Sequence, residues 1–342
     1  MKRESRLPVR IGLMRLTDTA PIVLAQEAGL LATEGLAAAL TVEPSWANLA
    51  DKLAYGLLDA AIMLPPLALA MALGLRTPAA RLIVPLGLSL GGNAVTLSEG
   101  LATPLLAEGR KPPRETALAL ARLLKHRPRP IFAVVHAWST HDLIFRSWLA
   151  EAGIDPARDV AWSVVPPSEM VAALADGRID GFCAGAPWGA VAAQTGVGRT
   201  VALSSEIWPN HAEKCLAVRA DWAEAQPDGL MALLRALLRA ATLAGQPARA
   251  ADLAEILADP AYVGAPAASI AASLPGGSGG EVDRSVFSPP DATEPRFADA
   301  ERFLTEMARW RALPADAVPE RVARMVYRPD LYRDAARAVE IG

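Results

Sequence analysis

The chain has 342 residues, of which 52% are hydrophobic and 21% are charged, and its formal net charge is −3. This length exceeds one ordinary hydrophobic core and suits two lobes of roughly 100 to 200 residues each. The charge carries no basic excess, and no run of Lys and Arg is interleaved with aromatic residues, which argues against direct nucleic-acid binding. The longest apolar stretch, residues 60–75, is shorter than the roughly 20 residues that a membrane span requires.

The opening residues and the cysteines predict a cytoplasmic protein. A secretory signal peptide needs an uninterrupted apolar segment of about 7 to 15 residues, and Arg6, Arg10 and Arg15 interrupt the opening segment. The two cysteines, Cys183 and Cys215, fit a reducing compartment. Neither has metal-ligand spacing to a histidine or to another cysteine, so we expect both to be small buried residues.

The first part of the chain alternates strands and helices, as the apolar runs and the positions of Gly and Pro indicate. The expected elements are a strand at 11–13, a helix at 18–31, a strand at 39–43, a helix from 46 that is interrupted at Gly56, a strand at 60–64, a helix ending at 75, a strand at 84–90 and an extended crossing segment at 91–98.

The rest of the chain first repeats this alternation and then becomes helical. The expected elements are a helix at 115–125, a strand at 131–135, a helix at 141–152, strands at 160–165 and 182–184, a return strand at 215–218, helices at 227–244 and 248–257, a mobile loop at 273–296, and helices at 297–310, at 319–325 and from 329 onward.

An internal repeat organises these elements. Gly56 and Asp59 map onto Gly177 and Asp180 at one constant offset of 121 residues, and each pair precedes an apolar strand that ends at proline. Each half therefore predicts a mainly parallel sheet flanked by helices, with a ligand cleft between two lobes. The expected division is residues 1–93 for the first lobe, 94–210 for the second lobe, and 211–342 for the return to the first lobe with C-terminal helices. A duplicated scaffold alone would explain the repeat equally well.

Five residues near the predicted cleft can donate hydrogen bonds: Trp46, Asn93, His141, Gly185 through its backbone, and Lys214. We assign no Asp or Glu to this set, so a small oxyanion that only accepts hydrogen bonds is the expected ligand. Bicarbonate carries a proton and would prefer an acceptor, which this set does not obviously supply. Each residue also has a structural interpretation: Trp46 as core packing, His141 as a helix cap and Lys214 as an exposed cation.

Catalysis has little support in the sequence. Asp18 and Asp142 are expected at helix starts rather than as acids or bases. No nucleophile with its base and no paired carboxylates can be assigned by spacing. We therefore predict a binding protein with no metal and no cofactor.

Several long segments carry a resemblance to a known family. They are PIVLAQEAGLLATEGL, SWANLADKLAYGLLDAAIMLPPLALAMALG, GNAVTLS, THDLIFRSWLAEAGIDP, VVPPSEMVAALADGRIDGFCAGAPW, IWPNHAEKCLAVRADW and VYRPDLYRDAA. At these residues the sequence closely resembles the nitrate- and bicarbonate-binding proteins of the NrtA/CmpA family, which have the type II periplasmic-binding-protein fold. The resemblance implies an α/β fold of two lobes and nitrate held by Trp46, Asn93, His141, Gly185 and Lys214. An acidic residue is expected at the lysine position in the bicarbonate branch, so Lys214 favours nitrate or nitrite.

The absence of a recognisable signal peptide resembles the cytoplasmic branch typified by the sensor NasS. That resemblance implies a nitrate/nitrite sensor that controls a partner, a NasT-like response regulator with RNA-binding antiterminator activity. One alternative is the substrate-binding component of a nitrate ABC importer. A less favoured alternative is a thiamine-pyrimidine synthase-like enzyme, for which the sequence offers neither a cysteine-rich metal segment nor a phosphate cradle. In either binding role, Lys214→Glu is expected to abolish nitrate affinity and to leave the fold intact.

Overall fold

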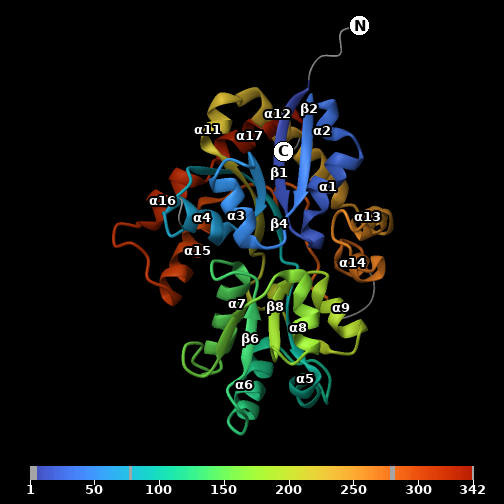
Figure 1. Ribbon diagram of the computed structural model, residues 1–342, viewed down its shortest axis with the longest axis vertical. Coiled ribbons are helices and arrows are strands. Elements are labelled where there is room, and N and C mark those ends of the chain that lie inside the picture. Colours follow the sequence, from blue (N-terminus) through green and yellow to red (C-terminus); the bar gives the residue numbers. More distant parts are fainter. Residues whose placement is uncertain (1–5, 77–78, 278–281, 341–342) are drawn as a thin grey trace.

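The structure is a computed structural model that describes residues 6–76, 79–277 and 282–340. Two five-stranded sheets form two lobes that lie one above the other along the long axis of the molecule (Figure 1). The strand order is β2-β1-β3-β10-β4 in the first sheet and β7-β6-β8-β5-β9 in the second. Helices flank both sheets, so the expected two-lobed α/β fold is confirmed.

The strands have the following bounds: β1 Leu7–Leu13, β2 Leu36–Val42, β3 Ala60–Met63, β4 Leu82–Leu90, β5 Asn93–Ser98, β6 Ile131–Val134, β7 Ala161–Val164, β8 Gly181–Gly185, β9 Gly198–Leu203 and β10 Ala212–Arg219. The α-helices are α1 Ala20–Glu27, α2 Leu30–Thr33, α3 Trp46–Ala54, α4 Pro65–Ala72, α5 Glu99–Leu105, α6 Pro113–Leu124, α7 Thr140–Ala150, α8 Met170–Ala175, α9 Trp188–Gln194, α10 Ser204–Ile207, α11 Ala220–Ala225, α12 Pro227–Ala244, α13 Ala250–Ala258, α14 Ala267–Ser273, α15 Phe297–Trp310, α16 Pro319–Val326 and α17 Pro329–Ala338. Three short 3-10 turns are η1 Thr17–Thr19, η2 Pro167–Glu169 and η3 Pro247–Arg249.

Each sheet contains one strand that runs against its neighbours. Strand β10 is antiparallel to β3 and β4 in the first sheet, and β5 is antiparallel to β8 and β9 in the second. The chain enters the second sheet at β5, directly after β4, and re-enters the first sheet at β10, directly after β9. The reversed strands are therefore the two that follow the crossings between lobes. The lobe limits 1–93, 94–210 and 211–342 stay a prediction, since the strands fix only which sheet each segment joins.

The repeat found in the sequence is also a repeat in structure. Gly56 and Gly177 both have positive φ, 72° and 65°, a conformation that residues with a Cβ rarely adopt. The carboxylates of Asp59 and Asp180 each accept a 2.8 Å hydrogen bond from a backbone N–H, that of Arg10 and that of Ile131. The two donors are related by the same offset as the two acceptors, so the turn and its anchor are duplicated together.

Two sequence predictions change in the structure. The segment expected as one helix at 18–31 forms three pieces, η1, α1 and α2, and the break between α1 and α2 occurs at Gly29, which has a φ of 70°. In the segment 273–296, Asp283, Phe287 and Thr293 are buried, so its described part is packed against the protein. Residues 278–281 of the expected mobile loop lie outside the described residues.

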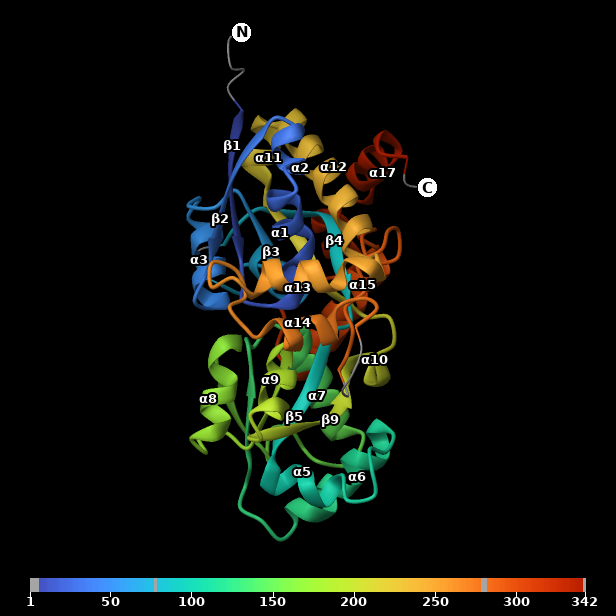
Figure 2. The ribbon, with the colours of Figure 1, turned by 90° about the vertical axis from the view of Figure 1, so that its right-hand side faces the viewer.

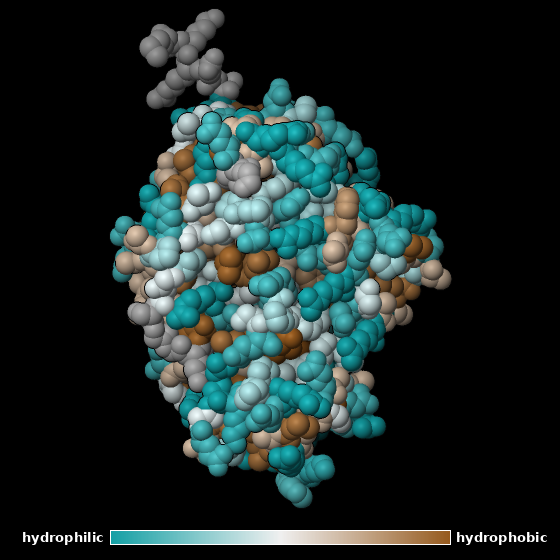
Figure 3. All heavy atoms as spheres, turned by 180° about the vertical axis from the view of Figure 1, so that it is seen from behind, coloured by the Kyte–Doolittle hydropathy of each residue, from teal (hydrophilic) through white to brown (hydrophobic). Residues whose placement is uncertain are grey.

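Several helices of the C-terminal part of the chain pack against elements of the first lobe. Helix α12 packs against α1 and α17 (Figure 2). Helix α15 packs against α4 and also reaches α7 of the second lobe (Figure 1). On the face seen from behind, hydrophobic residues are scattered among hydrophilic ones (Figure 3). Among the described residues, no helix combines the length and the hydropathy needed to cross a membrane.

Candidate functional site

The five predicted ligand-binding residues lie at element ends that face the junction of the lobes. Trp46 is the first residue of α3, and His141 is the second residue of α7. Both helices are capped by serine, since Ser45 Oγ accepts from the N–H of Asn48 and Ser139 Oγ accepts from the N–H of Asp142. His141 is therefore not the helix cap, and its ring remains free to face the site.

Lys214 of β10 is at the centre of the site. Its side chain is fully buried, and its Nζ lies 2.8 Å from Asp18 Oδ2 and 2.6 Å from Glu213 Oε1. The same Nζ lies 5.6 Å from the centroid of the Trp46 ring. Lys214 is thus a buried ammonium held between two carboxylates, and the exposed-cation interpretation is wrong.

The second lobe supplies the opposite wall. His141 Nε2 lies 3.5 Å from Glu213 Oε1, and both side chains are fully buried. Asn93 of β5 and Gly185 of β8 are paired across the antiparallel ladder. A Cβ on Gly185 would lie 3.4 Å from Asn93 Oδ1 and 3.5 Å from Asp18 Oδ2, so the absence of a side chain keeps this wall open.

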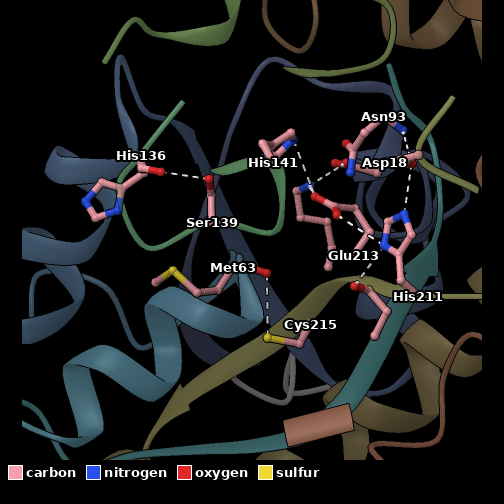
Figure 4. A network of polar contacts seen from close by, with 12 residues as sticks. Asp18, Met63, Asn93, His136, Ser139, His141, His211, Glu213 and Cys215 are labelled. Atoms are coloured by element: carbon pink, nitrogen blue, oxygen red, sulfur yellow. Dashed lines mark hydrogen bonds and ion pairs between the residues drawn. The ribbon is translucent and has the colours of Figure 1, made fainter. Parts of the chain in front are cut away.

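The structure therefore brings all five predicted residues together. Figure 4 shows Asn93, His141 and Asp18 converging around Glu213, although these residues come from four separate elements of the chain. That these residues hold an anion stays a prediction.

The expectation that no Asp or Glu belongs to this set is wrong. Asp18 lies in the turn η1, makes no capping bond there and instead contacts Lys214. Glu213 and Lys214 are consecutive in β10, where a regular strand would point them to opposite faces. The pairing of β10 with β4 shifts register on both sides of Lys214, which lets both side chains reach one site. The acidic neighbour was visible in the sequence, but the shift of register was not.

Two further residues that the sequence did not single out belong to the site. Thr140 precedes His141 on α7, and its buried hydroxyl has no hydrogen-bond partner. His211 Nδ1 lies 3.7 Å from Glu213 Oε2, and its Nε2 lies 2.8 Å from Ser204 Oγ, which donates to Asp283 Oδ2. His211 thus connects Glu213 to the segment that follows residue 281.

The site contains buried polar atoms without hydrogen-bond partners. Those that can donate are Trp46 Nε1, Asn93 Nδ2 and Thr140 Oγ1, and those that only accept are Asp18 Oδ1, Asn93 Oδ1 and Glu213 Oε2. Both ring nitrogens of His141 are also without a partner, and in the neutral ring one of them donates and the other accepts. A buried polar group without a partner costs about 1–3 kcal/mol. Such a concentration of unsatisfied groups could be satisfied by ordered water or by a polar ligand. The acceptors also mean that a proton-bearing anion is not excluded by the chemistry of the site.

Burial and charge shift the protonation of these groups. Burial raises the pKa of Asp18 and of Glu213, and the Lys214 ammonium opposes both shifts. Asn93 and Thr140 lie near Glu213 and oppose its shift weakly, although neither forms a hydrogen bond of normal geometry with it. Burial would lower the pKa of Lys214, but Asp18 and Glu213 more than offset this and raise it. Lys214 therefore stays charged, and a carboxyl group is the one that protonates readily.

The two imidazoles at the site are neutral near pH 7. Burial, and then Lys214 and His211, lower the pKa of His141 well below its usual range. Burial lowers the pKa of His211 to about 4. Lys214 is thus the one permanent cation facing Glu213 among the residues that the structure describes.

Within residues 6–76, 79–277 and 282–340, no group of three or more His, Cys, Asp and Glu side chains is arranged to hold a metal ion.

A cavity of about 630 Å³ lies at the far end of the second lobe, between α6 and the end of α7, and is lined by basic residues such as Arg122, Lys125 and Arg127. It contains none of the predicted site residues. Cys183 and Cys215 are buried and unpaired, as expected.

Residues 2–258 match the family described as NMT1-like. The chain belongs to the NMT1-like family. Within this family it is 35% identical to the nitrate/nitrite binding protein NrtA of Synechococcus elongatus, over 97% of this chain and 78% of the relative. It is also 35% identical to the bicarbonate transport ATP-binding protein CmpC of the same species, over 97% of this chain. The chain spans about half the length of CmpC.

The three-dimensional comparison agrees with this NMT1-like assignment. The crystal structure of the periplasmic nitrate-binding protein NrtA from Synechocystis PCC 6803 superposes with a TM-score of 0.91 at 27% identity and covers 98% of this chain and 90% of the other. The alkanesulfonate-binding protein SsuA of Xanthomonas axonopodis shares the fold, with a TM-score of 0.68 at 19% identity. The resemblance to NrtA-like proteins is confirmed, whereas closeness to the NasS branch stays a prediction.

Proposed function

We propose that the chain binds a small monovalent oxyanion, nitrate or nitrite, between its lobes and serves as the binding component of an importer. The observation that carries this proposal is the set of buried, unpartnered donors of Trp46, Asn93, Thr140 and His141 beside the Lys214 ammonium. An anion with several acceptor oxygens would satisfy these donors together, and the low dielectric around the site would strengthen each bond.

The contacts between the lobes support a closed binding form. The N–H of Thr17 donates to the carbonyl of Ala186 at 2.9 Å, and Trp188 Nε1 donates to the carbonyl of Arg15 at 2.9 Å. Both bonds join the first lobe to the second beside Asp18 and Gly185. A ligand at this junction would contact both lobes and stabilise the closed arrangement over an open one.

The importer role is supported by the names of the relatives above, which are transport and binding proteins. The sensor role, with a cytoplasmic location and a NasT-like partner, rests on the sequence resemblance alone. The two roles differ in their partner. Copurification with a permease and its ATPase supports the importer component, while nitrate-dependent release of a response-regulator-like protein would replace that role with the sensor.

Binding itself is tested by titrating the protein with nitrate in a calorimeter, with Trp46→Phe as the variant. This change keeps the ring over Lys214 and removes only the indole N–H. A hydrogen bond to a charged acceptor contributes about 1.5–3 kcal/mol, so affinity should fall about tenfold to hundredfold.

Trp310→Phe is the matched control, because Trp310 Nε1 is also buried without a partner but belongs to α15. It should bind nitrate as the unmodified protein does. Equal affinity for nitrate in Trp46→Phe and Trp310→Phe would place the anion elsewhere and reject this site.

A further inference from the structure

The site already holds more negative than positive charge before any anion enters. Lys214 is flanked by Asp18 and Glu213 at ion-pair distance, and all three side chains are buried. With every group ionised the cluster has one excess negative charge. A bound nitrate would make two, without water to screen them.

An excess buried negative charge destabilises the folded protein unless an opposite charge or a proton compensates it. An uncompensated buried charge costs several kcal/mol, and groups in that position usually change protonation instead. The imidazoles of His141 and His211 face Glu213 but are neutral, so within the described part of the chain Lys214 is the one cation that opposes the two carboxylates.

Two observations point to Glu213 as the group that changes. Its Oε1 is shared between Lys214 and His141, while its Oε2 has no hydrogen-bond partner although the side chain is fully buried. A proton on Glu213 would convert an unsatisfied acceptor into a donor beside the other unsatisfied donors of the site. Asp18 lies in η1, after β1 of the same sheet, and its Oδ1 also has no hydrogen-bond partner, but its side chain retains slight exposure.

We propose that Glu213 is the specificity residue of the site, and that it takes up one proton from solvent when a monovalent acceptor-only anion such as nitrate binds. This inference rests on the proposed function. The proton moves from water or buffer to a carboxylate oxygen of Glu213, Lys214 stays an ammonium, and nitrate enters without a proton. The site gains one negative and one positive charge together. A divalent oxyanion such as sulfate would need a second proton and is excluded.

Among the residues that the structure describes, few groups face Glu213 from the surrounding elements. They are Lys214 and the buried Cys215 on β10, His211 just before β10, Asp18 in η1, Thr140 and His141 on α7, Asn93 on β5, and the buried Cys183 on β8. Lys214 remains positive, and burial raises the pKa of Cys183 and of Cys215 and so keeps both thiols neutral. Asp18 is the one other group whose titration could imitate that of Glu213, so the experiment must separate these two.

The test is calorimetry with nitrate at pH 6 to 9 in pairs of buffers that differ in ionisation enthalpy. In the unmodified protein, the proton uptake should approach about one per nitrate at alkaline pH, and affinity should fall by about tenfold for each pH unit there. Glu213→Gln should still bind nitrate, with affinity independent of pH and without proton uptake. Asp18→Asn removes one buried negative charge and should reduce the proton uptake without abolishing it. Glu34→Gln, at a carboxylate that pairs with Arg235 and Arg239 away from the site, should match the unmodified protein.

Each remaining outcome has a defined meaning. Nitrate binding without proton uptake or pH dependence in the unmodified protein would overturn the inference and leave the proposed function standing, and this measurement needs no variant to fold. A pH dependence that survives in Glu213→Gln and disappears in Asp18→Asn would also overturn it. Sulfate binding as tight as nitrate binding would contradict the charge argument. No nitrate binding at any pH would reject the proposed function, and the inference with it.

Discussion

In the first lobe the carboxylate of Asp59 accepts a hydrogen bond from the backbone of Arg10, and in the second lobe Asp180 does the same for Ile131, with 49 residues between partners in both cases. The residues at the cleft are not repeated in this way. The first sheet contributes Lys214 and Glu213, and the second contributes Asn93 and Gly185. The duplicated positions support the turns, whereas the positions that face the ligand differ between the lobes.

The difference follows from what each position must do. A turn anchor has to hold the same backbone shape in either lobe, so the same residue types suit both copies. A site between two unlike walls has to surround one small ligand, and a symmetric set would place two lysines or two carboxylates against each other. The first wall therefore carries the charge, and the second supplies neutral donors.

The largest effect is expected from removing the central charge. Lys214→Met leaves Asp18 and Glu213 buried without their cation, which should lower the free energy of unfolding by about 3–5 kcal/mol and abolish nitrate binding. Chemical denaturation and calorimetry measure the two effects. Lys214→Glu would bury a third carboxylate in the cluster, so we now expect this change to destabilise the fold as well as to abolish nitrate affinity.

The pH dependence of this variant has a defined sign. Burial raises the folded-state pKa of Asp18 and Glu213 above the unfolded values, so their contribution to stability is complete below the unfolded pKa and is lost as pH rises through the folded pKa. The destabilisation of Lys214→Met should therefore be small in acid and grow toward neutral pH. Adding Asp18→Asn and Glu213→Gln should restore stability without restoring binding, while Lys111→Met, at an exposed pair, should change neither. Equal destabilisation at all pH values would contradict the charge argument.

The next effect separates the two turn anchors. Asp59 accepts from the backbone N–H of Arg10 and also from its Nε and Nη2, whereas Asp180 accepts from the backbone of Ile131. Asp59→Ala should cost about 2–3 kcal/mol and Asp180→Ala about 1 kcal/mol in chemical denaturation. The ion pair between Arg10 and Asp59 contributes little to the value for Asp59→Ala, because the Arg10 side chain is half-exposed. A larger loss of unfolding free energy for Asp180→Ala than for Asp59→Ala would contradict this ranking of the two turn anchors.

The sequence predicted the scaffold better than the site. The repeat of Gly56 and Asp59 at Gly177 and Asp180 indicated two similar lobes, because turn chemistry is local and can be recognised from residue types. The site depends on packing over long distances. As consecutive residues of a strand, Glu213 and Lys214 are expected to point to opposite faces of the sheet. The irregular pairing of β10 with β4 brings both to one site, and the sequence does not reveal this pairing. Asp18 suggested a helix start, and only the folded chain brings it to Lys214.

The duplicated glycines should respond equally to substitution. Gly56→Ala and Gly177→Ala each place a Cβ in the left-handed region, which costs about 1–2 kcal/mol in chemical denaturation. Space differs little, since a Cβ at Gly177 meets nothing within 4 Å and one at Gly56 meets the Arg219 guanidinium at 3.4 Å. Gly100→Ala is the control, because Gly100 lies in α5 with a nearest contact of 4.0 Å and should be neutral or slightly stabilising. A loss of stability in only one of the two variants would show that the two turns, although similar in shape, do not contribute equally to stability.

The smallest effect concerns closure of the lobes. Trp188→Phe removes the hydrogen bond from the indole of α9 to the carbonyl of Arg15 in the opposite lobe. One neutral bond contributes about 0.5–1.5 kcal/mol, so nitrate affinity in calorimetry should fall about twofold to tenfold. Trp162→Phe removes a similar indole-to-carbonyl bond, to Pro156, but within the second lobe, so it should leave nitrate affinity unchanged. If both variants lost affinity equally, the loss would come from stability of the second lobe, and the bond between lobes would not contribute to binding.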